Sequence, residues 1–114
     1  MRNTFRMEDE YITMVRGDTL SFNMELVEYT DALTGAYFTI RESALDGAPV
    51  VQKTLGDGIE LISDGLYSVR IAPEDSAGLE VGQYWYDLVI ECNGDRCTIL
   101  RGVIEFLQNY TEVS

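Results

Sequence analysis

Residues able to carry enzyme chemistry are scarce in this sequence. It contains 20 aspartates and glutamates but no histidine, so it lacks the commonest general base, the usual activator of a serine or cysteine nucleophile and the commonest metal ligand. Carboxylate pairs hydrolyse glycans when one pKa is raised and the other group stays ionised, but nothing distinguishes Glu74 and Asp75 from other pairs. No set of nucleophile, base and orienting group emerges, and we expect no catalytic residues and no cofactor.

The two cysteines, Cys92 and Cys97, flank the turn sequence Asn93-Gly94-Asp95-Arg96. A turn at Gly94-Asp95 would place the thiols opposite each other on a hairpin, within reach of a disulfide. A type I′ turn at Asn93-Gly94 would instead place Cys97 opposite Ile90 and separate the thiols. Because no export signal is visible and the expected compartment is reducing, we expect both thiols to stay reduced.

Two further groups of residues invite a functional interpretation. Asp57, Glu60 and Asp64 surround one expected hairpin and offer oxygen ligands for calcium, but the spaced loop pattern of a calcium site is absent. We interpret them as turn and edge charges and expect no metal site. Arg16-Gly17-Asp18 matches the tripeptide that integrins read, yet it lies between two expected strands, where glycine allows a turn and aspartate bonds to the backbone. We interpret it as a structural turn.

The aromatic run Tyr84-Trp85-Tyr86 is the most suggestive candidate for a contact surface. Alternation along a strand sends Tyr84 and Tyr86 to one face and Trp85 to the other. If the tyrosines pack inward with Leu88 and Ile90, Trp85 points outward, where an exposed indole suits a protein interface or a stacked sugar ring. The alternative is that a loop or a neighbouring strand covers Trp85.

Composition narrows the classes of partner. The length of 114 residues is typical of a single domain, and the sequence has a formal net charge of −12 and a single lysine, Lys53. Such a charge repels phosphate backbones and anionic lipids, so we expect no nucleic acid and no membrane as partners. No apolar run approaches the ~18 residues of a membrane helix, and the opening residues carry charges where a signal peptide is apolar.

The periodicity indicates an all-β domain. Apolar side chains alternate with polar ones in Leu20 to Leu26, Tyr67 to Ile71 and Tyr84 to Ile90, and no stretch has a helical period over three turns. Glycine, asparagine and aspartate mark closely spaced turns between such runs. We expect about eight strands, near residues 11–15, 19–28, 36–42, 49–54, 58–62, 66–71, 83–92 and 96–106, which is typical of a sandwich or barrel.

One short helical turn is expected at 73–79, where Pro73, two acids and Gly78 supply helix start and stop signals, and we expect it to cross between sheets. The sandwich should span residues 11–106. Residues 1–10 form an N-terminal arm that contains Phe5 and Met7, and residues 107–114 form a tail that contains Tyr110. Either end could pack on a neighbouring molecule, so these three residues join Trp85 as candidate interface residues.

The order of motifs resembles a known family. The matching segments are Arg-Gly-Asp-Thr at 16–19, Leu-Thr-Gly at 33–35, Tyr-Phe-Thr-Ile-Arg at 37–41, Gln-Lys-Thr-Leu at 52–55, Gly-Ile-Glu-Leu at 58–61, Pro-Glu-Asp-Ser-Ala-Gly-Leu at 73–79, Gly-Gln-Tyr-Trp-Tyr-Asp-Leu at 82–88 and Ile-Leu-Arg-Gly at 99–102. Over residues 10 to 106 the series resembles small immunoglobulin-like β-sandwich proteins of tailed bacteriophages and prophages, including the N-terminal domain of baseplate upper proteins. Baseplate upper proteins carry further domains beyond this one, whereas here we expect one domain and a short tail.

The resemblance implies an immunoglobulin-like antiparallel sandwich that serves as a non-catalytic virion component of the baseplate, tail fibre, neck or capsid. It would be made in the host bacterial cytoplasm, end up in the virion, form a homo-oligomer and bind other phage virion proteins. The resemblance assigns no functional residue. The alternative hypothesis is a carbohydrate-binding accessory module that uses exposed aromatic side chains.

Overall fold

The computed structural model describes residues 10–26, 31–42 and 48–111. Eight strands and one helical turn follow one another along the chain, and every expected strand is found to within three residues at each end. Their bounds are β1 (Glu10–Val15), β2 (Leu20–Glu25), β3 (Gly35–Arg41), β4 (Pro49–Leu55), β5 (Gly58–Ser63), β6 (Leu66–Ile71), α1 (Pro73–Ser76), β7 (Gly82–Cys92) and β8 (Asp95–Leu107).

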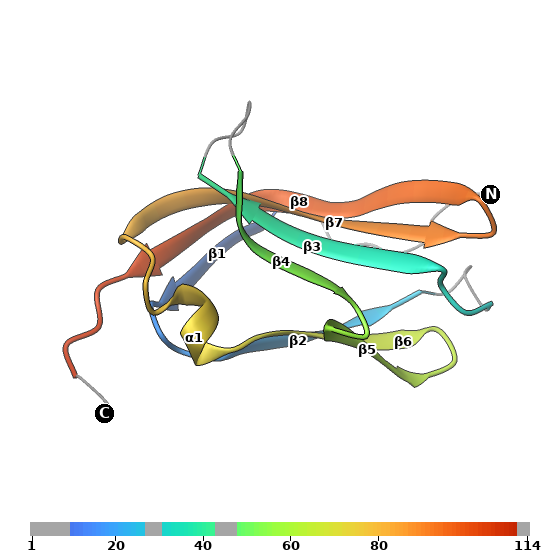
Figure 1. Cartoon of the computed structure of the whole chain (residues 1–114), viewed down its shortest axis with the longest axis horizontal. Coiled ribbons are helices and arrows are strands. Elements are labelled where there is room, and N and C mark those ends of the chain that lie inside the picture. The colour runs from blue at the N-terminus through green and yellow to red at the C-terminus, as the bar shows by residue number, and fades with distance from the viewer. Residues whose placement is uncertain (1–9, 27–30, 43–47, 112–114) are drawn as a thin grey trace.

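The strands form one continuous hydrogen-bonded ladder in the order β1-β8-β7-β3-β4-β5-β6-β2, which folds over into two layers (Figure 1). One layer holds β1, β8, β7, β3 and β4, and the other holds β5, β6 and β2. The sheet bends from one layer to the other between β4 and β5, which share two residue pairs around a tight turn. This division of strands is that of an immunoglobulin-like sandwich, with β2, β6 and β5 on one side and β8, β7 and β3 on the other.

Most neighbouring strands run antiparallel, as expected, and the short contact between β4 and β5 is parallel. The second parallel pair is β1 with β8, which are paired over the whole length of β1, from Glu10 opposite Gly102 to Val15 opposite Leu107. This pairing joins the two ends of the domain. No local sequence pattern predicts the pairing of β1 with β8, because the two strands are about 90 residues apart.

The core lies between the layers and is built from the alternating side chains. Met24 and Leu26, the tyrosines at 67, 84 and 86, and the aliphatic residues Val69, Leu88 and Ile90 are all buried. Phe38 on β3 lies near the centre, 5.8 Å from Phe22 on the opposite layer and 5.7 Å from Tyr86 on β7, measured between ring centroids. Removing these apolar side chains from water is the main force that holds the layers together.

The helical turn α1 joins β6 in one layer to β7 in the other, so the expected crossover is confirmed, although the helix itself spans only Pro73–Ser76. Its last residue, Ser76, is fully buried. Proline at the first helical position and acids in the first turn are the features that start the helix.

Candidate protein interface

Trp85 occupies the middle of the five-stranded layer. It lies on β7, the third strand of the five, and is paired with Arg41 on β3 and Val103 on β8. Its neighbours Tyr84 and Tyr86 are buried in the core, whereas Trp85 is 39% exposed on the opposite face. The alternation predicted that Trp85 and the two tyrosines lie on opposite faces, and the structure shows that the tyrosines face the core. We call this outward surface of β1, β8, β7, β3 and β4 the outer face.

A hydrogen-bonded group of polar side chains lies on the outer face beside Trp85. The Tyr11 hydroxyl on β1 donates to Glu105 Oε1 on β8 at 2.5 Å and accepts a bond from Gln83 Nε2 on β7 at 2.8 Å. The bond to Glu105 raises the pKa of Tyr11, with a smaller contribution from burial. The three side chains satisfy one another, so the rim around Trp85 has a fixed shape.

Charges of both signs lie on the outer face. Asp87, two residues beyond Trp85, is opposite Arg101 on β8, and burial raises the pKa of its carboxyl, an effect that Arg41 and Arg96 oppose. At the end of β7 the Tyr37 hydroxyl donates to Glu91 Oε1 at 3.1 Å, and this bond raises the pKa of Tyr37.

The Arg16-Gly17-Asp18 turn is tied into the sandwich. Arg16 donates from Nη1 to the Leu79 carbonyl at 2.9 Å and from Nη2 to Asn109 Oδ1 at 3.2 Å. The backbone N–H of Gly17 donates to the buried Ser76 hydroxyl at 2.9 Å. Because the arginine side chain bonds to two separate segments and the glycine bonds to α1, the geometry agrees with the structural interpretation of this tripeptide.

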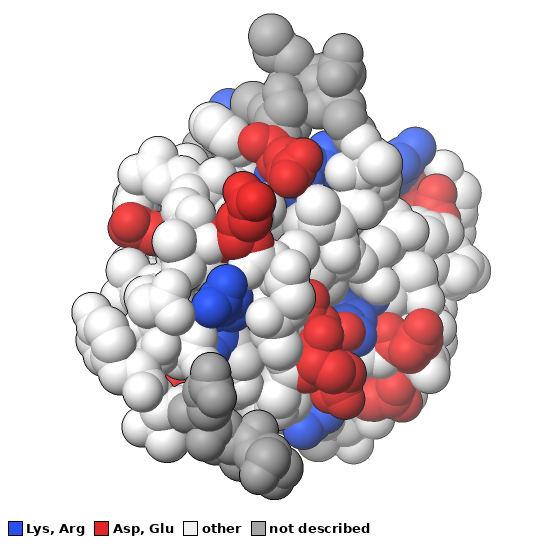
Figure 2. Space-filling model, turned by 60° about the vertical axis from the view of Figure 1, so that its left-hand side comes forward, with Lys and Arg blue, Asp and Glu red and all other residues white. Residues whose placement is uncertain are grey.

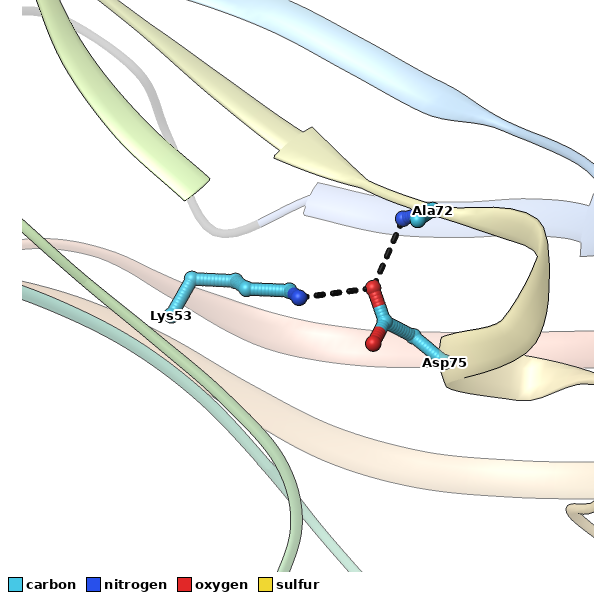
Figure 3. A network of polar contacts seen from close by, with 3 residues as sticks. All are labelled: Lys53, Ala72 and Asp75. Carbon is cyan, nitrogen blue, oxygen red and sulfur yellow. Dashed lines mark hydrogen bonds and ion pairs between the residues drawn. The ribbon is translucent and has the colours of Figure 1, made fainter. Parts of the chain in front are cut away.

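Lys53 and Asp75 form an ion pair that bridges the layers at α1 (Figure 3). Lys53 Nζ on β4 lies 2.7 Å from Asp75 Oδ2, and the same oxygen accepts the Ala72 N–H at 2.7 Å. Burial raises the pKa of Asp75, but the bonds from Lys53 and Ala72 outweigh it and lower the pKa below its ordinary value. Asp75 is thus held in a partly buried ion pair that also caps the start of α1.

The hairpin between β7 and β8 turns at Asn93-Gly94, where both residues have positive φ, as a type I′ turn requires. Cys92 is then opposite Asp95, and Cys97 is opposite Ile90. No disulfide joins the two thiols. Burial is the main cause that raises the pKa of the Cys92 thiol, and Asp31 and Asp95 raise it further.

The other candidate residues lie apart from the outer face or outside the described residues. Tyr110 follows β8 and is 95% exposed. Phe5 and Met7 lie outside the described residues. Within 10–26, 31–42 and 48–111, no group of three metal-ligating side chains lies close enough to hold an ion, and this includes the acids at 57, 60 and 64. No helix of these residues is long and apolar enough to span a membrane.

The sequence analysis did not predict the hydrogen bond of the Tyr84 hydroxyl. The Tyr84 hydroxyl, at the start of β7, donates to the Glu80 carbonyl four residues upstream at 2.8 Å. This is the tyrosine corner of immunoglobulin-like sandwiches, in which a cysteine follows two residues later in antibody domains. Here that position holds Tyr86, which packs on Phe38. The spacing of α1 and the aromatic run was the signal that would have found the corner.

The charged side chains are unevenly spread. Figure 2 shows the end of the molecule near α1, where acidic side chains gather in groups, single basic side chains lie beside them, and uncharged surface separates the groups. Two basic side chains are committed to contacts within the fold: Arg16 bonds at the turn and Lys53 forms the ion pair. Few basic side chains therefore remain to balance the acids.

Solved structures resemble this chain, whereas no protein-family model and no curated protein matches it. Among solved structures, the natural killer cell receptor NKp44, described as a triggering partner in natural cytotoxicity, matches with a TM-score of 0.49 at 17% identity, over 89% of this chain and 98% of that one.

Proposed function

We propose that this protein is a non-catalytic structural component of a phage virion that acts through protein–protein assembly. The observation that carries the assembly role is the position of Trp85, a large aromatic side chain held partly exposed on the central strand of a sheet face. Tryptophan, with tyrosine and arginine, is enriched among the residues that contribute most to binding at protein interfaces. The order of sequence motifs supports the assignment to a virion.

Three features of the described residues agree with a role without catalysis. The hydroxyls and carboxylates of the outer face bond to one another, as in the group of Tyr11, Gln83 and Glu105. Asp75 is committed to an ion pair with Lys53. Among the carboxylates that the structure describes, only Asp87 has a raised pKa. It lies on an open sheet surface beside arginines, whereas catalytic acids with a raised pKa normally lie in clefts.

A carbohydrate-binding module is the second candidate, because Trp85 and Tyr11 are exposed aromatic rings on one face. The polar groups beside them argue against it. A sugar hydroxyl that bonded to the Tyr11 hydroxyl would have to compete with the bonds that Gln83 and Glu105 already make there, so that contact would gain little.

The virion assignment is tested on phage particles purified from bacteria that carry the coding sequence. We expect mass spectrometry to find the protein in the particles at a fixed ratio to the major tail or capsid protein. Its absence from particles that are complete by electron microscopy would overturn the proposal. A glycan array probed with the purified protein tests the alternative, for which we expect no signal that depends on Trp85.

A further inference from the structure

We infer that the outer face is a docking surface for a second copy of this chain, with a two-fold axis near Trp85. This inference rests on the proposed assembly function and names its partner and surface. It is argued from the distribution of charge, the apolar side chains on the face and the size of the layer.

The outer face is electrically balanced on a strongly acidic protein. Residues 11–26, 31–42 and 48–111 contain 14 carboxylates and six basic side chains. Strand register places three of each on the outer face: Arg41, Arg96, Arg101, Asp87, Glu91 and Glu105. The remaining described surface therefore holds eleven carboxylates against three basic side chains, of which Lys53 is already paired.

This imbalance restricts how two copies can meet. At physiological salt a charge acts over about 8 Å, so the charges that matter are those near the contact. Two copies that approached through any acidic surface would oppose carboxylates to carboxylates. The outer face brings together two areas without net charge, and a two-fold arrangement places that same area on both sides.

Apolar side chains on the outer face supply the attraction. Tyr11, Trp85 and Leu107 are each at least 39% exposed, and Val103 lies between Trp85 and Tyr11 in the strand register. An interface core of aromatic and aliphatic side chains ringed by polar groups is the usual anatomy of a specific protein contact.

The layer is large enough for a stable contact. Five strands at a spacing of about 4.8 Å form a layer roughly 20–24 Å wide. The 11 residues of β7 extend about 36 Å, although the flanking strands are shorter. The projected area is on the order of 600 Å², and a surface covered with side chains exceeds its projection, so the face approaches the ~800 Å² per partner of a standard interface.

Because Trp85 is the chain's only tryptophan, the wild-type protein reports on its own association. We expect light scattering of the full chain to show a dimer and tryptophan emission to shift to shorter wavelength as the concentration rises. Because each copy carries a charge of −12, screening reduces repulsion, so we expect the dimer to tighten between 50 and 500 mM NaCl.

Two matched variants locate the contact. Trp85→Arg and Ile62→Arg add the same charge, and Ile62 is 53% exposed on β5 in the other layer. We expect Trp85→Arg to weaken the dimer at least about thirty-fold, the effect of losing an interface hot spot, and Ile62→Arg to leave it within about threefold. Thermal unfolding by circular dichroism checks that both variants fold.

Four outcomes would overturn the inference. These are a monomer with no emission shift up to 1 mM, a dimer that weakens with added salt, a dimer that both variants or neither variant affects, and a larger oligomer that dissociates only when residues 1–10 are deleted. The last result would still support the assembly function, and detection in phage particles tests that function separately. If Trp85→Arg fails to fold, the emission shift of the wild-type protein decides alone.

Discussion

Breaking the Lys53–Asp75 ion pair should destabilise the sandwich by an amount that the structure lets us bracket. Exposed ion pairs contribute about 0.2–1 kcal/mol, while removing one partner of a fully buried pair costs about 3–5 kcal/mol. Here the side chains are 15% and 21% exposed, so water still reaches both charges. We therefore expect Lys53→Met and Asp75→Asn each to lower the free energy of unfolding by about 1–2 kcal/mol.

The two substitutions and their combination form a double-mutant cycle. Methionine keeps the unbranched stem of Lys53, and asparagine keeps an oxygen that accepts the Ala72 N–H. The double variant should lose less than the sum of the two single losses, with a coupling of about 1 kcal/mol. Urea unfolding followed through Trp85 emission measures all four proteins, and a 1 kcal/mol loss corresponds to a fall in Tm of about 3–6 °C for this size.

The pH dependence supplies a second readout. The pKa of Asp75 is lower in the folded protein than its unfolded value of about 3.9, so its contribution is fully present above that value and is lost as the pH falls through the folded pKa. The stability difference between wild type and Asp75→Asn should therefore be constant from pH 6 to 8 and shrink below about pH 4. A coupling indistinguishable from zero, or a difference that persists at pH 2, would refute this account of the ion pair.

Three further predictions follow from single residues. Gly58→Ala should destabilise the fold by about 1–3 kcal/mol in urea unfolding, because Gly58 has a φ of +98° and a Cβ there would lie 2.6 Å from the Lys53 stem. The control is Gly78→Ala, whose Cβ would meet nothing within 4 Å and which should be neutral or mildly stabilising. Equal effects of the two substitutions would contradict this prediction. A thiol reagent should label Cys97 but not the buried Cys92 in the native protein, and both in urea; two rapidly labelled native thiols would contradict the structure. Tyr84→Phe should cost about 0.5–1.5 kcal/mol in thermal unfolding through loss of the hydroxyl bond at the tyrosine corner, and an unchanged Tm would show that this bond is dispensable.

Local rules predicted most of the strands. Period-two alternation located β2, β6 and β7 and the direction in which Trp85 points, because each of these depends on neighbours one or two residues away. The sequence left two turns open, one at Asn93-Gly94 and one at Gly94-Asp95, which differ by a shift in strand register. The pairing of β7 with β8 along their whole length decides between the two registers.

Contacts between distant segments could not be predicted. Three kinds of contact each join residues that are 20 or more positions apart: the parallel pairing of β1 with β8, the ion pair from β4 to α1, and the bonds of the Arg16 side chain to Leu79 and Asn109. Nothing in Lys53 or Asp75 alone indicates the partner. Likewise, the balanced charge of the outer face appears only after strand register has assigned each arginine and carboxylate to a side.

The pairing of β1 with β8 has a consequence for synthesis on the ribosome. The hairpins β3-β4, β5-β6 and β7-β8 close over short loops and can form as soon as they emerge, but β1 is made early and its sole partner among the described strands is β8, the last strand of the sandwich to be made. Until then β1 leaves its backbone groups and apolar side chains without native contacts. A nascent chain of this protein therefore holds an unpaired strand for almost the entire time that it is being translated, and chaperones that bind extended apolar segments have that long to reach it.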